Sequence, residues 1–527
     1  MKRVLCGIAG VVLAVVFGHP DVRAGGMEWP DNGTRSLGRA GAFTAKADDP
    51  TAIVLNPAGL GFQRGYSLTF DNNLVRQNVC AQRSGEYPGT AGPYTYAGQP
   101  YPEVCRNLKG MFYIPMVAAA FDFGLKNWTF AIGGYGPHAV GRREFPMSVT
   151  VQDTDGRNVR APGPTRYDVE NLNVIVLFFT LAAAYRPVDW LSFGAALQIV
   201  YADVDYSVFV PLTPNYDPDG DIRFQIRTKG VAYTGLLSVL ANPWAGLYLG
   251  ASLRLPVRAD TKGDAWINLP SNYASMASVI EWGRTCDDAS QNNWCPTKHK
   301  AGLVTELPLA LRTGIRYAWK MKSHKAAPDL VDIELDIVWE RWSSIKSFDT
   351  QLNARLLGTP MEVFALPHHY QDVVEYRLGG SFTVPRMVGG GWLTFRLGAF
   401  YGNDASPLEY TRLDYAAWAR VGVFAGMSYL IMGMDLHLGF TYVWNGTGER
   451  WKPWSFKAKR QVDHSCLTPI DAFTPPDPSR CADPSASPLS SDMARGTYHG
   501  SFVALSLGLT VRFDELAREI KKRKAPR

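Results

Sequence analysis

Long apolar runs are almost absent from this chain of 527 residues. The one candidate, Val4–Gly18, follows a short basic stretch and is too short to span a bilayer as a helix. Val22-Arg23-Ala24 then offers small residues at the positions that a signal peptidase recognises. We therefore expect residues 1–24 to be a Sec signal peptide, and the mature chain to contain no transmembrane helix.

Short catalytic and metal-binding motifs are missing as well. The sequence holds no GxSxG nucleophile motif and no CxxC pair. His368 and His369 are adjacent at a predicted loop end, and His437 falls on a predicted inward-facing position. We therefore predict no catalytic residue, no bound metal and no cofactor.

No excess of one charge sign points to a polyanionic partner. The net charge is +6, and it falls to +4 once the charged residues of the signal peptide are removed (three basic, one acidic). Basic and acidic residues are mixed along the chain except in a basic tail after Phe513. This distribution argues against a nucleic-acid-binding function.

Cysteine is sparse, and its distribution suits an exported protein. Of seven cysteines, Cys6 lies in the signal peptide, which leaves six. Six cysteines allow fifteen pairings, and we favour the local one because each local pair brackets a polar, turn-rich segment in a compartment where disulfides survive. The predicted disulfides are Cys80-Cys105, Cys286-Cys295 and Cys466-Cys481.

What the sequence has in abundance is alternation of apolar and polar residues. In Val331–Ile337, Asp332, Glu334 and Asp336 alternate with four aliphatic residues, which is the period of a two-faced strand. The segments run about ten residues or more, the length that a tilted strand needs to cross a bilayer. Full charges on the polar face fit a water-accessible lumen and do not fit the core of a β-sandwich.

The alternation predicts an all-β fold, a fourteen-stranded antiparallel transmembrane β-barrel spanning residues 64–513. In hydrocarbon an unpaired backbone group is costly, so such a sheet must close on itself. Short turns alternate with long loops, as in outer-membrane barrels. The predicted strands are 64–78, 109–123, 127–137, 171–187, 190–211, 222–241, 247–258, 305–320, 331–345, 370–384, 391–402, 418–430, 433–447 and 498–513, and the long loops between them include 79–108, 138–170, 259–304, 346–369, 403–417 and 448–497.

The two ends of the mature chain do not alternate. Residues 25–63 are rich in glycine, and because a fourteen-stranded lumen is too wide for its own side chains to fill, we predict that they form an N-terminal hatch inside it. Residues 514–527 are predicted to be a charged, helical, periplasmic tail. Its run Lys521–Lys524 is either a solvated end or a contact with anionic head groups.

The predicted hatch carries a combination of motifs that resembles one known family. Gly38-Arg39-Ala40-Gly41-Ala42, then Ala47-Asp48-Asp49-Pro50, then Asn56-Pro57-Ala58-Gly59-Leu60 is similar to the hatch of the FadL/TodX-type transporters of long-chain fatty acids and aromatic hydrocarbons. Asp336–Ser343 and Phe395–Tyr401 resemble strands of the same family. The three cysteine pairs, their long loops and the tail after residue 513 depart from it.

The resemblance implies a function and a route. It implies uptake of a hydrophobic molecule, which we interpret as a long-chain fatty acid, across the bacterial outer membrane by a monomeric barrel. Substrate would pass from the outer loops to the lumen and leave sideways into the membrane through a kinked third strand. The implied gating residues are Asn56, Pro57 and Ala58 of the hatch, and the implied lateral opening is at Gly133, Gly134, Gly136 and Pro137, where glycine and proline weaken a strand.

Inward-facing arginines are candidates for binding a fatty acid carboxylate, because a guanidinium presents a planar fork of donors. The candidates are Arg312, Arg316, Arg377 and Arg396. The alternative is a ladder of charges that braces the barrel and the hatch. An arginine paired with two acids would be a poor ligand for substrate, so a less compensated one is favoured.

Other functions stay open at this point. An aromatic or alkane transporter of the same fold is the nearest alternative. A barrel enzyme that acts on lipid and an adhesive barrel with large disulfide-tied loops are the alternatives from other classes.

Overall fold

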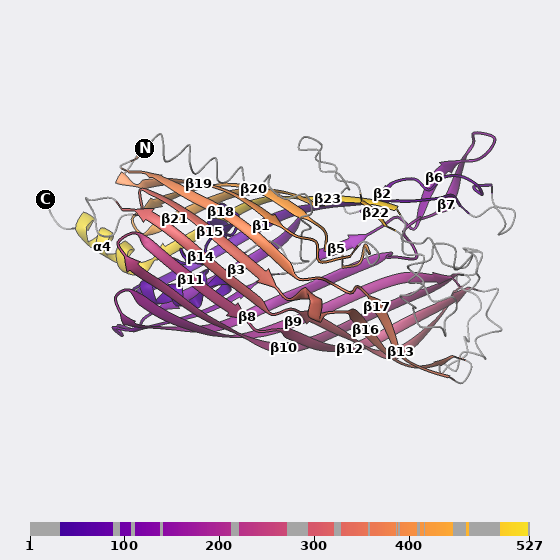
Figure 1. Ribbon diagram of the computed structural model, residues 1–527, viewed down its shortest axis with the longest axis horizontal. Coiled ribbons are helices and arrows are strands. Elements are labelled where there is room, and N and C mark those ends of the chain that lie inside the picture. Colours follow the sequence, from indigo (N-terminus) through magenta and orange to yellow (C-terminus); the bar gives the residue numbers. More distant parts are fainter. Residues whose placement is uncertain are drawn as a thin grey trace.

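The wall of the molecule is one antiparallel sheet that closes into a barrel (Figure 1). The computed structural model describes residues 32–87, 95–106, 111–136, 141–211, 221–270, 294–320, 328–356, 359–385, 387, 390–407, 412–415, 417–445, 460–462 and 496–524. In the described chain the first strand, β1, pairs with the last, β23, from Ser67↔Arg512 to Arg83↔Gly496. The predicted fourteen-stranded barrel is confirmed.

Nine of the fourteen wall positions are filled by a single strand and five by two strands in line, within the described residues. The single strands are β1 (Tyr66–Arg83), β3 (Phe112–Phe121), β8 (Asn171–Val188), β9 (Leu191–Pro211), β10 (Asp221–Trp244), β19 (Trp392–Gly402), β20 (Arg420–Ile431), β21 (Met434–Asn445) and β23 (Gly496–Arg512). The pairs in line are β4 (Trp128–Tyr135) with β5 (Gly141–Glu144), β11 (Leu247–Arg254) with β12 (Val257–Pro270), β13 (Trp294–Leu307) with β14 (Ala310–Trp319), β15 (Val331–Glu340) with β16 (Ser347–Leu356), and β17 (Thr359–Pro367) with β18 (Val373–Val384).

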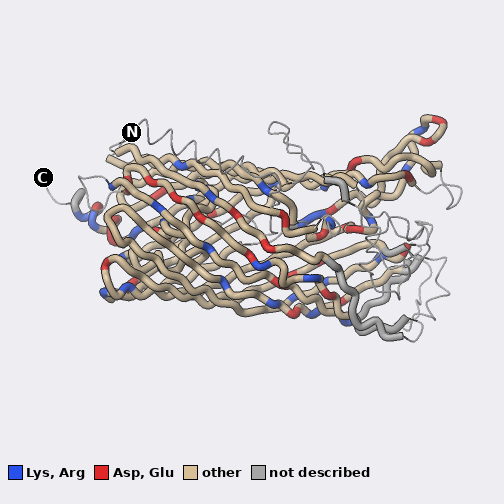
Figure 2. Tube along the Cα trace, viewed as in Figure 1, with Lys and Arg blue, Asp and Glu red and all other residues tan. Residues whose placement is uncertain are grey.

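The alternation seen in the sequence sorts side chains between the lumen and the outer surface. In β15, Asp332, Glu334 and Asp336 are buried, whereas Leu335 and Ile337 are more than 40% exposed on the outer face. An apolar outer face matches the hydrocarbon that surrounds a transmembrane barrel. Figure 2 shows the charged residues spread along the wall as isolated positions.

Several strands are longer than predicted, and the predicted loop bounds were wrong there. The interval 259–304 contains most of β12 and β13, and 346–369 contains β16 and β17. Cys80, placed in a loop by the sequence, lies within β1. The reason is physical: beyond the lipid the outer face carries ion pairs, such as Arg227–Asp205 at 2.9 Å and Lys300–Asp264 at 3.0 Å, so the apolar half of the pattern disappears while the strands continue.

Tight turns mark one end of the barrel, and exposed aromatic residues surround it. Between β20 and β21 the chain reverses at Met432 and Gly433, both with positive φ (52° and 79°), as the favoured two-residue hairpins require. Aromatic girdles lie where a barrel meets the lipid head groups. The exposed aromatic residues at this end are Tyr66, Phe123, Trp128, Tyr185, Trp190, Trp244, Tyr317 and Trp319.

Short elements complete the fold. Helices α2 (Thr34–Leu37) and α3 (Ala52–Leu55) and the 3-10 helix η1 (Pro57–Phe62) lie inside the barrel, and η4 (Trp342–Ser344) separates β15 from β16. The hairpin β6 (Ser148–Gln152) and β7 (Asn158–Pro162) projects from the end opposite helix α4 (Phe513–Lys524) (Figure 1). The last strand ends at Arg512, so Phe513, which we expected to end it, begins the helix instead. Among described residues no helix is long and apolar enough to cross a membrane.

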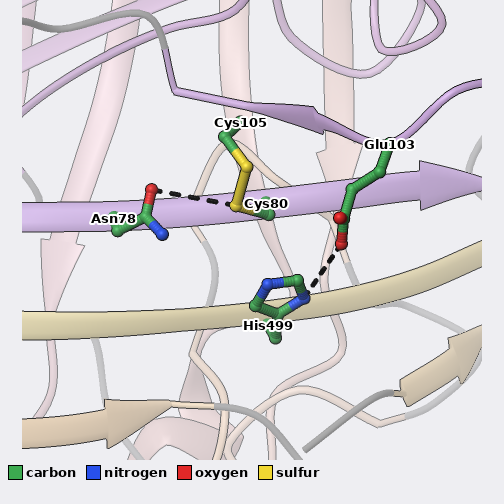
Figure 3. The surroundings of a disulfide bond; sticks show 5 residues. All are labelled: Asn78, Cys80, Glu103, Cys105 and His499. Atoms are coloured by element: carbon green, nitrogen blue, oxygen red, sulfur yellow. Dashed lines mark hydrogen bonds and ion pairs between the residues drawn. A yellow bond between two sulfur atoms is a disulfide. The ribbon is translucent and has the colours of Figure 1, made fainter. Parts of the chain in front are cut away.

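One predicted disulfide falls on described residues, and the structure contains it (Figure 3). Cys80 of β1 is bonded to Cys105 of the short strand β2 (Val104–Cys105), and the two residues are directly paired across the strands. Beside it, His499 Nδ1 lies 3.5 Å from Glu103 Oε1. The predicted pairs Cys286-Cys295 and Cys466-Cys481 lie outside the residues whose side chains are described. Another short strand, β22 (Arg460–Val462), pairs with β23.

We expect the double substitution Cys80→Ala/Cys105→Ala to lower the free energy of unfolding. The bond closes a loop with a sequence separation of 25, and chain-entropy estimates give about 3 kcal/mol for a loop of this length. The measurement is guanidinium unfolding of the folded barrel in lipid vesicles. An unchanged midpoint would show that the loop ends are held together without the bond.

Candidate functional site

The lumen is filled at one level by the hatch, whose described part runs from residue 32 to residue 63 and is buried almost throughout. Its backbone is held by two carboxylates of β15. Asp336 accepts hydrogen bonds from the N–H groups of Phe43 (3.0 Å) and Thr44 (2.9 Å), and Glu334 accepts one from Ala45 (2.6 Å). These bonds satisfy buried backbone donors that no regular secondary structure satisfies.

The same wall neutralises the basic side chains of the hatch. The Arg39 guanidinium is fully buried, forms an ion pair with Asp332, and donates to Glu334 at 3.0 Å. Lys46 Nζ lies 2.9 Å from Asp332. A buried charge that loses its partner costs about 3–5 kcal/mol, so the hatch and β15 stabilise each other strongly.

Glycines in the wall let the hatch backbone approach closely. A Cβ at Gly398 would lie 2.3 Å from the carbonyl carbon of Arg39, and one at Gly250 would lie 2.4 Å from the Thr44 oxygen. On the neighbouring strand β20, Gly426 faces Gly38 of the hatch, with 3.0 Å between a Cβ on either glycine and the other's Cα. Larger side chains at these inward positions would displace the hatch.

The predicted gating residues lie at the junction of the hatch with β9 and β10. Asn56 Nδ2 donates to the carbonyl oxygens of Thr44 (2.7 Å) and Val239 (3.2 Å), and its Oδ1 accepts from Ala58 N (3.1 Å). Ala58 N also donates to Ser238 Oγ at 2.9 Å. One amide side chain therefore ties two parts of the hatch to the wall. The contact with Ser238 carries no signal in the sequence.

Pro57 and Ala58 pack against a glycine of β9. A Cβ at Gly194 would lie 2.2 Å from Ala58 N and 2.5 Å from the Pro57 carbonyl carbon. The proline begins η1, and Asn56 caps that helix with its side chain. Because proline has a fixed φ and lacks an N–H, the start of η1 is rigid.

In the third wall position the described residues form two strands in line, β4 and β5, and residues 137–140 between them lie outside the described residues. Within the described part the β3–β4 ladder extends to Met116↔Tyr135, with one further bond from Gly136 N to Pro115 O, and β1 and β3 stay paired up to Val75↔Phe112. The continuation, β5, pairs with β8 alone in the described chain. Pro137 lies outside the described residues.

The predicted glycines of β4 differ in what they face. A Cβ at Gly133 would lie 2.4 Å from Ile53 Cδ1 of the hatch, whereas one at Gly134 would make only an ordinary contact with Phe179 at 3.4 Å on the outer face. One at Gly136 would meet Pro115 Cδ at 3.1 Å. Gly133 therefore lies against the hatch, and Gly136 lies at the end of the described β3–β4 ladder.

The inner face beside β4 and β5 is apolar, which the prediction of a water-accessible lumen with charged side chains did not include. Buried inward side chains of β8, β9 and β10 form one hydrophobic cluster with the hatch. Tyr135 stacks on Phe178 at 5.3 Å, and its hydroxyl accepts from Gln198 at 2.7 Å. The apolar sector, as we call this surface, consists of Val174, Val176, Phe178, Val200, Ala202, Val204 and Ile226 on the wall with Ile53, Val54, Leu55 and Leu60 on the hatch.

The candidate arginines are all buried, and they differ in their partners. Arg316 forms ion pairs with Asp329 and, at 3.5 Å, with Asp332, and Arg377 pairs with Glu375 at 2.5 Å. Arg396 donates to Ser428 Oγ at 2.9 Å and makes no ion pair with a described residue. Arg312 is buried, faces the lumen and interacts with another residue of the chain. The structure does not bring these four side chains together at one point.

The loop between β19 and β20 folds into the mouth of the barrel, which the sequence did not predict. Arg143 Nη1 donates to the carbonyl oxygens of Leu413 (2.9 Å) and Asp414 (2.7 Å), and Leu413 N donates to Asp168 at 2.8 Å. Burial raises the pKa of Asp168 to about 6. His368 Nε2 lies 3.1 Å from the Asp414 carboxylate, so one of the two adjacent histidines is engaged in an internal contact.

The charge of this inner loop is balanced within the mouth. Burial by itself raises the pKa of Asp414, but the charges of Arg412 and His368 outweigh that effect and hold the pKa below its usual range. The Arg412 guanidinium lies 3.1 Å from Asp414. Among the described side chains no group of three or more potential metal ligands converges.

Known proteins share this architecture. The family model described as "Outer membrane protein transport protein (OMPP1/FadL/TodX)" matches residues 15–449. Among solved structures, the chain is similar to a Pseudomonas aeruginosa FadL homologue (12% identity, 93% of this chain and 100% of the other, TM-score 0.63). It is also similar to the Pseudomonas putida toluene transporter TodX (14% identity, 92% and 99%, TM-score 0.59) and the Ralstonia pickettii toluene transporter TbuX (14%, 92% and 98%, 0.57). No curated protein matches the sequence.

We expect Glu334→Gln to loosen the hatch, because the buried Arg39 guanidinium would lose one of its two carboxylate partners. The measurement is the sensitivity of cells to a large hydrophilic antibiotic that an occupied lumen excludes, at equal surface amounts of protein. Sensitivity should rise. The matched control is Glu306→Gln, which removes the solvent-accessible pair with Arg258 on the outer surface. Equal sensitivity of the two variants would contradict a bracing role for Glu334.

Proposed function

Since the chain belongs to the OMPP1/FadL/TodX family of outer membrane transport proteins, we propose that it takes up long-chain fatty acids and releases them sideways into the membrane. Members of this family are transporters of hydrophobic compounds, so the chain is a transporter and not an enzyme. The observation that carries the finer proposal is the apolar sector beside the third wall position, which consists of β4 and β5. A fatty chain gains about 0.8 kcal/mol per buried methylene. A ligand that passes directly from this apolar surface into lipid keeps that gain, because it does not return to water on the way.

The side exit rests on three neighbouring features. Among described residues the β3–β4 ladder reaches Met116↔Tyr135. Gly133 and Gly136 are the residues of β4 and its continuation that allow close packing at that point. The apolar residues Val174, Val176 and Phe178 of β8 line the lumen on the far side of the same position. A ligand held there is next to the membrane across a wall position that is divided between two strands, β4 and β5.

The hatch acts as the gate in this proposal. Ile53 contacts the β4 glycine position, and Asn56, three residues later, is fixed to β10. A shift of Asn56–Ala58 therefore changes the position of Ile53 at the exit. Because Asn56 makes its bonds with backbone carbonyls, the hatch can move without leaving a buried unpaired charge.

Arg396 is the candidate we favour for the carboxylate of the substrate. Arg316 and Arg377 already have carboxylate partners, so binding a substrate there would require breaking an ion pair. Arg396 donates to a hydroxyl group and lies on the inner face of β19. Its cross-strand partner on β20, Gly426, contacts the hatch. An anionic ligand would add a partner there without displacing one.

An uncharged aromatic hydrocarbon is the second candidate substrate. Two of the similar structures are toluene transporters by their titles, and the apolar sector itself contains no charged side chain. The two candidate substrates differ in their need for Arg396, because only a carboxylate ligand would bind this guanidinium. Substitution of this arginine therefore separates them.

The test is uptake of labelled oleate and labelled toluene by cells that lack their own transporter. We expect wild-type protein to support oleate uptake, and Arg396→Gln to reduce it about tenfold while toluene uptake is unchanged. Charge-assisted hydrogen bonds contribute about 1.5–3 kcal/mol, which corresponds to a change of this size. Uptake of toluene and not oleate by a correctly folded wild-type barrel would replace the fatty acid assignment with the hydrocarbon one.

We also expect Asn56→Ala to reduce uptake at equal surface levels. The substitution removes two bonds to backbone carbonyls and the cap of η1. The matched control is Asn242→Ala, since Asn242, near the end of β10, also donates to two carbonyls (3.0 and 2.6 Å), neither of which belongs to the hatch. Uptake by Asn56→Ala that equals the control would show that the hatch does not gate transport through this residue.

A further inference from the structure

Helix α4 lies at the rim of the barrel that carries the tight turns (Figure 1). It begins at Phe513, directly after β23 ends at Arg512. The backbone N–H of Tyr66, the first residue of β1, donates to Asp514 Oδ2 at 3.3 Å. The first turn of the helix is therefore fixed to the start of the wall.

The aromatic girdle defines the depth of this rim in the membrane. Tyr66 is 46% exposed and belongs to the girdle, together with outward residues such as Trp128 and Trp244 in neighbouring strands. Amphipathic aromatic rings of this kind sit at the level of the lipid head groups. Because Asp514 contacts Tyr66, α4 starts at the same level.

One face of α4 is an apolar stripe. Phe513, Leu516, Ala517 and Ile520 follow helical spacing of three, four and seven residues, which places them on one side. Phe513 is 46% exposed and Ile520 is 43% exposed, although the helix touches the ends of β1 and β23. A helix in water would gain nothing from presenting this stripe.

The acidic and the basic residues of the helix differ in their contacts. The acidic residues of the first turn are engaged, Asp514 with Tyr66 and Glu515 with Arg512 at 3.7 Å. Arg518 and Lys521 are exposed, and the sequence continues with Lys522-Arg523-Lys524. Residues 514–527 contain six basic and three acidic residues. The exposed residues that remain for a partner are apolar in the stripe and basic at Arg518 and Lys521. Figure 2 marks Lys and Arg positions along this helix in blue.

We propose that α4 is an interfacial anchor that binds anionic phospholipids of the periplasmic leaflet. The stripe of Phe513, Leu516, Ala517 and Ile520 lies among the outer methylenes of the acyl chains, and Arg518 and Lys521 contact phosphate groups. Helices with an apolar face and basic flanks bind membrane surfaces in this way, and each basic residue near an anionic surface adds attraction. The anchor fixes the depth and tilt of the barrel next to the seam where β1 and β23 close the wall.

The experiment places an environment-sensitive fluorophore on the stripe. Ile520→Cys in the full-length, oxidised protein is labelled with NBD and reconstituted into vesicles of phosphatidylcholine alone or with phosphatidylglycerol. Asp155→Cys, exposed in the β6–β7 turn at the opposite end, provides the solvent reference. Wild-type protein treated with the same reagent corrects for labelling of native thiols.

We expect the Ile520 label to emit at shorter wavelength than the Asp155 label and to be quenched by lipids brominated on the acyl chains. The difference should grow when phosphatidylglycerol is present and shrink at high salt. Arg518→Gln/Lys521→Gln should remove that growth. Lys126→Gln, which removes an exposed charge from the β3–β4 turn at the same rim, should leave it unchanged.

Two results would overturn the proposal. If the Ile520 label behaves like the Asp155 label in both kinds of vesicle, the helix is solvated and the anchor does not exist. If the label is immersed but responds neither to phosphatidylglycerol nor to the loss of Arg518 and Lys521, the helix does not recognise anionic head groups. Neither result depends on which substrate the barrel carries.

Discussion

The pairing of backbone hydrogen bonds in a medium without water is the constraint on which this structure depends. Each strand must find partners on both sides, because an unpaired group costs several kcal/mol in hydrocarbon. The long ladder between β1 and β23 meets this demand by joining the two ends of the sheet. Among described residues the β3–β4 ladder is shorter than the β1–β3 ladder beside it, and the apolar sector and the hatch lie behind it.

Closing fourteen strands creates a second problem, since the lumen is too wide for the wall to fill. The hatch solves it with two kinds of contact. On the β15 side it is held by charged groups, with Asp332, Glu334 and Asp336 satisfying both side chains and backbone of the hatch. On the β8–β10 side it is held by apolar packing and by the neutral amide of Asn56. Charged contacts with well-defined geometric partners resist small shifts more strongly than apolar contacts do.

Much of the fold and part of the site were predictable from local pattern. Alternation in a strand such as Val331–Ile337 reports directly which side chains face lipid, because a transmembrane strand has one apolar face along its length. The same rule failed for β12 and β13, where the outer face leaves the lipid and carries ion pairs such as Lys300–Asp264. It also failed for the inward loop after β19, since Leu413 and Asp414 are held by Arg143, a residue 270 positions away in sequence. Arg39 and Asn56 belong to motifs that are recognisable in the sequence. The sequence did not predict which residues of β15 and β10 they contact.

The sequence by itself determined the class of the protein: an exported chain, closed as a fourteen-stranded barrel, with a glycine-rich segment inside it. These properties follow from period, composition and length, which act over a few residues at a time. Tertiary structure alone decided which arginines are compensated and that one sector of the lumen is apolar. The reason is that Arg396 and Arg316 are equivalent as inward residues of a strand, and they differ in the side chains that the folded chain places beside them, Asp329 and Asp332 beside Arg316 and Ser428 beside Arg396.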